Sequence, residues 1–138
     1  MLSSGIVTIY REGVFTLEEA RQLLPVIRRI TQEHSHKVNE LMGRLEAMEP
    51  GSQQGLEIEK QINSLISSWH SKIKKLGADS KGLWLVDFDS GDGHYCWKYP
   101  ESELNYWHSY SDGFSNRQLI EDCSQPKPSR ISEKDSSL

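Results

Sequence analysis

The chain has 138 residues, of which 36% are hydrophobic, with a mean hydropathy of -0.63 and a formal net charge of -4. This length suits one domain with a modest core and is too short for a two-domain enzyme. No segment approaches the ~20 apolar residues of a membrane span. Two cysteines and the lack of a signal peptide in residues 1–15 indicate a reduced, soluble, cytoplasmic protein.

Residues 16–77 predict a helical hairpin. Thr16 and Glu19 have the spacing of a capping box, in which each side chain accepts a hydrogen bond from a free backbone amide, so a helix should begin there. Apolar residues then recur at helical spacing on both sides of the breaker run 49–52. The first series is Ile27, Ile30, His34, Val38, Leu41, Leu45 and Met48, and the second is Ile58, Ile62, Leu65, Trp69, Ile73 and Leu76.

The two series mirror each other about a turn at 50–54, which predicts an antiparallel two-helix coiled coil. In this pairing His34 faces the ring of Trp69. We interpret His34 as a packed seam residue rather than as a metal ligand. A hairpin with one apolar seam often pairs with a second copy in a four-helix bundle, so we expect a homodimer. Ala20, Leu23 and Leu24 extend past the end of the second helix and should pack on the segment that follows it.

Residues 82–120 form an aromatic segment, because nine of the twelve aromatic residues lie between Trp84 and Phe114. Composition predicts strands at 83–88 and 94–99, a turn between them, and a third short strand at 104–108. Such a small sheet is not stable alone, so we expect it to pack against the helices. The expected fold is therefore α+β: a long antiparallel two-helix coiled-coil hairpin capped by a small antiparallel β-sheet.

The domain boundaries follow from composition. Residues 1–123 read as a single domain, with a possible further strand at 6–10. Residues 124–138 are rich in Ser, Lys and Asp and predict a disordered tail. Between Gly77 and Cys123 three basic residues stand against nine acidic ones, which repels a phosphate backbone and argues against nucleic-acid binding.

Four residues of the aromatic segment carry metal-ligand chemistry. His94 and Cys96 are two apart, so on a strand both point to one face, and His108 and Asp87 could complete a three-ligand zinc site. Against this, a single cysteine without a Cys-x-x-Cys partner is weak spacing for a metal, and a buried cysteine is often a small hydrophobe. Cys96, His108 and Asp87 could instead be a thiol nucleophile, its base and an orienting group.

The ordered motifs FTLEEARQLLPVIRRI (15–30), KGLWLVDF (81–88), CW (96–97), NYWH (105–108) and DGFSNR (112–117) resemble the family known as domain of unknown function 2203, a family of uncharacterised bacterial proteins. The resemblance assigns no reaction. Where the family usually has Gly-Arg before the second strand, this chain has Asp92-Gly93-His94, and His94 could substitute locally for the arginine. The positions that match the recurrent motifs are Asp87, Cys96, Trp97, Trp107, His108, Gly113 and Arg117.

The first functional expectation is a non-catalytic binding module that presents an aromatic, acidic cap to a protein or a small molecule. Its expected ligand-binding residues are Asp87, Cys96, Trp97, Trp107, His108 and Arg117. The alternative is a metal-binding or thiol-dependent enzyme that uses Asp87, Cys96 and His108, with His94 as a further metal ligand. The enzyme needs Cys96 and His108 within reach of each other in a concave pocket, whereas the binding module does not.

Overall fold

The computed structural model describes residues 14–123, so the predicted strand at 6–10 and the predicted tail at 124–138 lie outside the described residues. Two long helices and a five-stranded antiparallel sheet confirm the α+β class. The elements in chain order are α2 (Leu17–Glu46), α3 (Gln53–Lys75), β1 (Asp79–Gly82), β2 (Leu85–Asp89), β3 (His94–Lys98), β4 (Tyr106–His108), η1 (Phe114–Asn116), β5 (Gln118–Leu119) and α4 (Ile120–Cys123).

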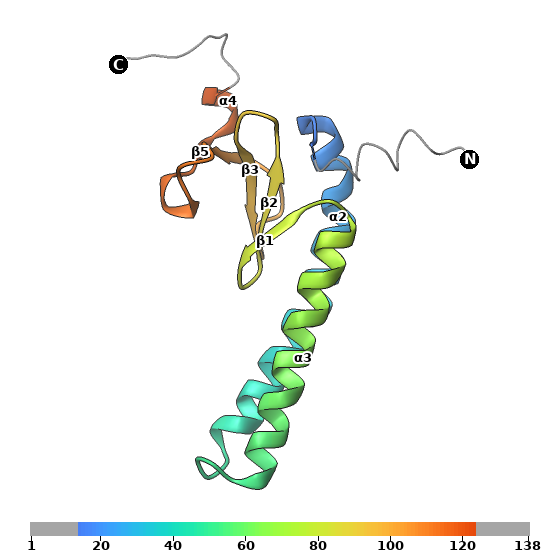
Figure 1. Cartoon of the computed structure of the whole chain (residues 1–138), viewed down its shortest axis with the longest axis vertical. Helices are drawn as coiled ribbons and strands as arrows, with labels where there is room; N and C mark the ends of the chain where they lie inside the picture. The colour runs from blue at the N-terminus through green and yellow to red at the C-terminus, as the bar shows by residue number, and fades with distance from the viewer. Residues whose placement is uncertain (1–13, 124–138) are drawn as a thin grey trace, which may run out of the picture.

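The helices form a long arm, and the sheet lies beside the end of that arm opposite the α2–α3 loop (Figure 1). The sheet order is β1-β2-β3-β4-β5, so each strand pairs with its neighbour in sequence. This order needs only short connections, which suits a sheet of antiparallel hairpins. Within residues 14–123, no helix has the length and apolar character that crossing a membrane requires.

Helix α2 begins where the capping box predicts. The backbone amide of Glu19 donates to Thr16 Oγ1 over 3.0 Å, and the amide of Thr16 donates to Glu19 Oε1 over 2.9 Å. Helix α3 is capped by Ser52, whose hydroxyl accepts from the amide of Gly55. The predicted turn at 50–54 therefore extends too far, because this cap starts the helix at Gln53.

The hairpin seam contains a polar contact that the apolar pattern does not reveal. The indole nitrogen of Trp69 donates to the hydroxyl of Thr31 over 2.8 Å, and both residues are buried. The ring of Trp69 meets the ring of Trp84 edge-on at 4.9 Å. His34 is buried on the same helix face as Thr31, but its Nδ1 is paired with the backbone carbonyl of Ile30. Two partners of the Trp69 indole are therefore Thr31 and Trp84, and the packing of His34 against this ring stays a prediction.

The first strand differs from the sequence prediction. Gly82 ends β1, and Leu83 and Trp84 form the turn to β2, with Trp84 at φ 62°. The predicted strand at 83–88 was thus wrong at its start, and β1 was missed. Its residues Asp-Ser-Lys-Gly carry no apolar alternation, so nothing in the pattern indicates a strand. Packing against Trp69 holds Trp84 in a conformation that few non-glycine residues adopt.

The main core lies between α2 and the sheet. Ala20, Leu23 and Leu24 of α2 join Val86 and Trp97 in one buried cluster. The prediction that the first turns of α2 pack on the aromatic segment is confirmed. Because side chains alternate across a strand, the residues next to Val86 and Trp97 must point to the other face of the sheet.

Candidate functional site

The sheet has an inner face toward the helices and an outer face away from them. Val86, Phe88 and Trp97 lie on the inner face and belong to the core. The alternation of strands β2 and β3 therefore puts Asp87 and Cys96 on the outer face. The strand register places Asp87 opposite Cys96, and His94 opposite His108. We define the outer face by the residues Asp87, His94, Cys96, Tyr106 and His108.

Asp87 and His108 meet across an intervening strand. Nε2 of His108 lies 3.2 Å from each carboxylate oxygen of Asp87, and both residues are only 3% exposed. Asp87 lies on β2 and His108 on β4, with β3 between them. The imidazole must therefore reach over β3. The second ring nitrogen, Nδ1, lies 2.8 Å from the carbonyl oxygen of Ser109, which can only accept, so Nδ1 carries a proton and donates it. The carboxylate of Asp87 also accepts, so in the metal-free protein a second proton lies between Nε2 and Asp87.

Cys96 completes a compact cluster with these two residues. One ligand-type atom each from Asp87, Cys96 and His108 lies within 4.8 Å of the others, and all three residues are buried. Burial raises the pKa of the Cys96 thiol to about 12, and the charge of Asp87 and a hydrogen bond to it act in the same direction. The free thiol therefore holds its proton at neutral pH and donates it to Asp87. We call Asp87, Cys96 and His108 the outer-face cluster.

Arg117 closes the cluster on the side of β5. Its guanidinium hydrogen-bonds to Cys96 and forms an ion pair with Glu101 at 2.9 Å. The same guanidinium lies between two aromatic rings, 4.0 Å from the centroid of Tyr106 and 4.2 Å from that of Phe114. Cation–π contacts on both sides fix the position of the charge. Arg117 is thus held beside the sulfur of Cys96 by three side chains.

His94 borders the cluster on its other side. Its ring centroid is 5.3 Å from that of His108 and 5.2 Å from that of Tyr110, whose hydroxyl donates to Asp89 over 2.7 Å. Burial is the largest effect on His94 and lowers the pKa of its imidazole, while the nearby charge of Asp87 raises it by less. The imidazole is therefore neutral at pH 7. Nδ1 of His94 is buried and has no hydrogen-bond partner among residues 14–123. When the proton of the neutral imidazole is on Nε2, Nδ1 is an available electron-pair donor.

The two tryptophans expected at the site lie elsewhere. Trp97 is fully buried on the inner face, where its indole donates to the carbonyl of Glu101 over 2.8 Å. Trp107 neighbours His108 in sequence, so it faces the opposite way, and its indole donates to the hydroxyl of Ser90 over 3.2 Å. Their predicted ligand-binding role stays a prediction. The sequence analysis missed Tyr106, which the register of β3 and β4 places opposite Cys96. It also missed Glu101 and Tyr110, which lie outside these strands, so the strand register gives no signal for them.

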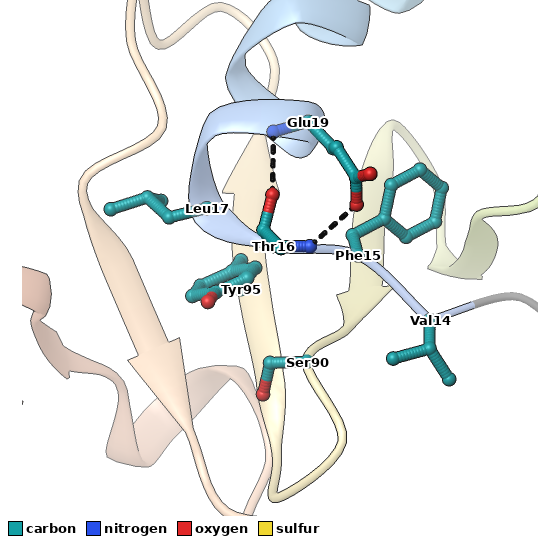
Figure 2. A pocket seen from close by; sticks show the side chains of 7 residues that line it. All are labelled: Val14, Phe15, Thr16, Leu17, Glu19, Ser90 and Tyr95. Carbon is teal, nitrogen blue, oxygen red and sulfur yellow. Dashed lines mark hydrogen bonds between the residues drawn. The ribbon is translucent and has the colours of Figure 1, made fainter. Parts of the chain in front are cut away.

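A cavity of about 410 Å³ lies between the start of α2 and the β2–β3 hairpin (Figure 2). It is lined by Val14, Phe15, Thr16, Leu17, Glu19, Ser90 and Tyr95. The polar side chains of Thr16 and Glu19 are already used in the capping box (Figure 2). The outer-face cluster contributes no residue to this lining, so the cavity and the cluster are separate features.

Comparison with known proteins identifies the family. No curated protein and no solved structure matches the chain. A family model described as an uncharacterised conserved protein, DUF2203, matches residues 13–120. The match covers most of the chain, including the N-terminal turns of α2 and all three residues of the outer-face cluster. The chain therefore belongs to the family of uncharacterised conserved proteins called domain of unknown function 2203.

Proposed function

We propose that this protein binds a divalent metal ion of the zinc type at the outer-face cluster. The observation that carries the proposal is the convergence of a carboxylate, a thiol and an imidazole from three adjacent strands to within 4.8 Å. Sulfur, nitrogen and carboxylate oxygen together are the ligand types that zinc takes in proteins. Buried groups of this kind are costly unless they are paired or hold a metal.

The hydrogen bonds of His108 support this assignment. A metal-binding histidine commonly donates its second N–H to a backbone carbonyl, which fixes the tautomer and the ring orientation. Nδ1 of His108 faces the carbonyl of Ser109 in this way, and Nε2 points to the cluster. Tetrahedral zinc with bonds of about 2.0–2.3 Å holds neighbouring ligand atoms roughly 3.3–3.6 Å apart, so the cluster needs to contract by about 1 Å.

The charges of the cluster also suit a cation. Asp87 supplies one negative charge, and Cys96 supplies a second when metal binding displaces its proton to the solvent and leaves a thiolate ligand. The nearby cation, Arg117, is already neutralised by Glu101. A divalent ion would therefore meet two negative ligands. The same burial makes a free thiol nucleophile the weaker alternative, because a pKa of about 12 leaves almost no thiolate at neutral pH.

We infer that the metal serves a binding module rather than an enzyme. All three ligand residues are at most 3% exposed, which leaves little access for a substrate. Tyr110 and Phe114 are exposed beside this site, at 53% and 40%, and would present aromatic surface to a partner protein. The excess of acidic residues over 77–123 makes nucleic acid the less suitable partner.

We also propose that the helical hairpin forms a homodimer. Ile62, Leu65 and Ile66 of α3 are only half-buried although they continue the spacing of the buried Ile58 and Trp69. In a two-helix arm each seam residue packs against only one other helix. The helices of a second copy would cover the part of these side chains that stays exposed. A reduced Cys96 in the site suits a reducing compartment, which supports a cytoplasmic location.

Elemental analysis tests the metal site. The protein is purified without chelator or affinity metal, alongside Cys96→Ser, His108→Ala and the control His36→Ala, which changes an exposed histidine of α2. We expect about one zinc or similar ion per chain in the wild type and the control, and its loss in both site variants. Metal-free wild-type protein that also fails to take up added zinc would refute the proposal.

A further inference from the structure

We infer that His94 is a fourth ligand, so that the outer face holds a closed Asp-Cys-His-His site without an open position for water or substrate. The inference rests on the proposed metal site and makes it more specific. It assigns to His94 a role that the three-residue cluster alone does not require. The consequence is a metal that fastens strands together and performs no reaction.

The strand register supports this arrangement. Asp87 lies opposite Cys96 in one row of the outer face, and His94 lies opposite His108 in the next. Cys96 and His94 both belong to β3, whereas Asp87 comes from β2 and His108 from β4. The four positions therefore surround a single point above β3, midway between its two outward side chains. Directly opposed residues have Cβ atoms about 4.5–5.5 Å apart, which long side chains can close around one ion.

The unpaired nitrogen of His94 is an independent observation. Nδ1 is buried and has no hydrogen-bond partner among residues 14–123. An unsatisfied buried nitrogen destabilises the folded state, so native proteins rarely keep one without a reason. The ring lies beside the ring of His108, 5.3 Å between centroids and tilted by 44°. His94 is not among the residues whose ligand atoms lie within 4.8 Å of one another, so its ring must turn toward the ion that Nε2 of His108 faces, and coordination would then satisfy this nitrogen.

The ring of His94, which is partly exposed, has a further contact on the side of the segment after β4. Tyr110 packs edge-on against the ring at 5.2 Å, and the Tyr110 hydroxyl is anchored to Asp89. This contact limits the orientations that the ring of His94 can take. Two neutral imidazoles with the carboxylate and the thiolate give a ligand charge of about -2, which balances a divalent ion. A closed neutral site of this kind is typical of structural zinc.

Cobalt(II) substitution distinguishes four ligands from three. Metal-free full-length protein is titrated with cobalt(II) under reducing conditions, and the absorption bands report the coordination number and the bond to the Cys96 sulfur. His94→Gln is compared with His36→Ala, and circular dichroism verifies that each variant is folded. We expect a four-coordinate spectrum for the wild type that added imidazole leaves unchanged.

For His94→Gln we expect the affinity for cobalt(II) to be at least about tenfold lower than that of the wild type. Loss of a residue that only supports a metal ligand already costs this much. Added imidazole should then fill the open position and restore the four-coordinate spectrum, which a merely structural role of His94 would not produce. Identical spectra and affinities for wild type and His94→Gln would overturn the fourth ligand and leave a three-ligand site. A wild-type protein that binds no cobalt would overturn both the fourth ligand and the metal site.

Discussion

The imidazole of His108 reaches over strand β3 to place Nε2 3.2 Å from both carboxylate oxygens of Asp87. This contact links β2 to β4, two strands that share no backbone hydrogen bonds because β3 lies between them. The link adds to the backbone pairing of β4 with β3 and β5, in a strand of only three residues. The pair therefore stabilises the outer face even before any metal binds.

Asp87→Asn should destabilise the metal-free protein. The amide keeps the size of the side chain but removes the charge that pairs with His108 and accepts from Cys96. Hydrogen bonds to charged groups contribute about 1.5–3 kcal/mol, so we expect a loss of that order in the free energy of unfolding, measured by urea denaturation with chelator present. Glu40→Gln, at an exposed position of α2, is the control. Equal small effects for both variants would show that the pair adds no stability.

Thr31→Val tests the polar contact of the hairpin seam. The substitution keeps the shape of the side chain but removes the acceptor of the Trp69 indole N–H. An unsatisfied buried donor costs about 1–3 kcal/mol, and we expect a decrease of that size in the free energy of unfolding. In a Trp69→Phe background the same substitution should cost much less, because no donor remains. An unchanged cost in that background would rule out the hydrogen bond as its cause.

Much of the fold could be predicted because it depends on local patterns. The capping box of Thr16 and Glu19 and the two apolar series follow directly from residue spacing. Strand β1 could not be predicted, since Asp79–Gly82 has no apolar face and pairs with β2 only through its backbone. The hydrogen bond between Thr31 and Trp69 could not be predicted either. A threonine in the sequence does not show which residue across the seam its hydroxyl will contact.

The candidate site was predictable to the extent that it depends on strand alternation. Asp87, Cys96 and His108 were proposed together from sequence, and the structure brings them together. The same alternation separates Cys96 from Trp97 and His108 from Trp107, because neighbours on a strand face opposite ways. The closure of the site by Tyr110 and Arg117 depends on how the segment after β4 folds back, which no periodic pattern describes.

Gly93→Ala should disrupt the start of β3. A Cβ atom at this position would lie 2.3 Å from the ring of Trp107 and 2.6 Å from the carbonyl oxygen of His108, so β4 would have to move. We expect a loss of about 3 kcal/mol in the free energy of unfolding, at the upper end of typical overpacking costs, together with reduced metal content. Gly113→Ala is the control because nothing lies within 4 Å of its added Cβ. If the Gly93 variant is as stable as this control, the close approach of Trp107 is wrong.

Light scattering tests the proposed homodimer. We expect twice the chain mass of 15.8 kDa, because the half-buried residues Ile62, Leu65 and Ile66 need a second copy to cover them. Leu65→Glu should shift the protein to a monomer, since a charge at the centre of an apolar interface is costly to desolvate. Glu57→Gln, at an exposed position of α3, should leave the mass unchanged. A monomeric wild type at high concentration would exclude the dimer.

Cys96 should make the stability of the metal-free protein fall at alkaline pH. Its pKa is about 12 in the folded protein, above the ordinary value of 9.0 that the unfolded chain has. Below the unfolded pKa both states hold the proton, so the thiol adds no pH dependence. Between the two pKa values only the folded state keeps the thiol proton. As the pH rises through this range, the free energy of unfolding falls by up to about 1.4 kcal/mol per pH unit.

The measurement is urea unfolding at about pH 8 and about pH 10 with chelator present, for wild type and Cys96→Ser. Tyrosine and lysine titrate in the same range, but they contribute equally to both proteins, so the difference between the two slopes belongs to the thiol. The serine variant should lose less stability on going to the higher pH. Parallel slopes would mean that Cys96 ionises as easily when folded as when unfolded, and would return a thiolate at this position to consideration as a nucleophile.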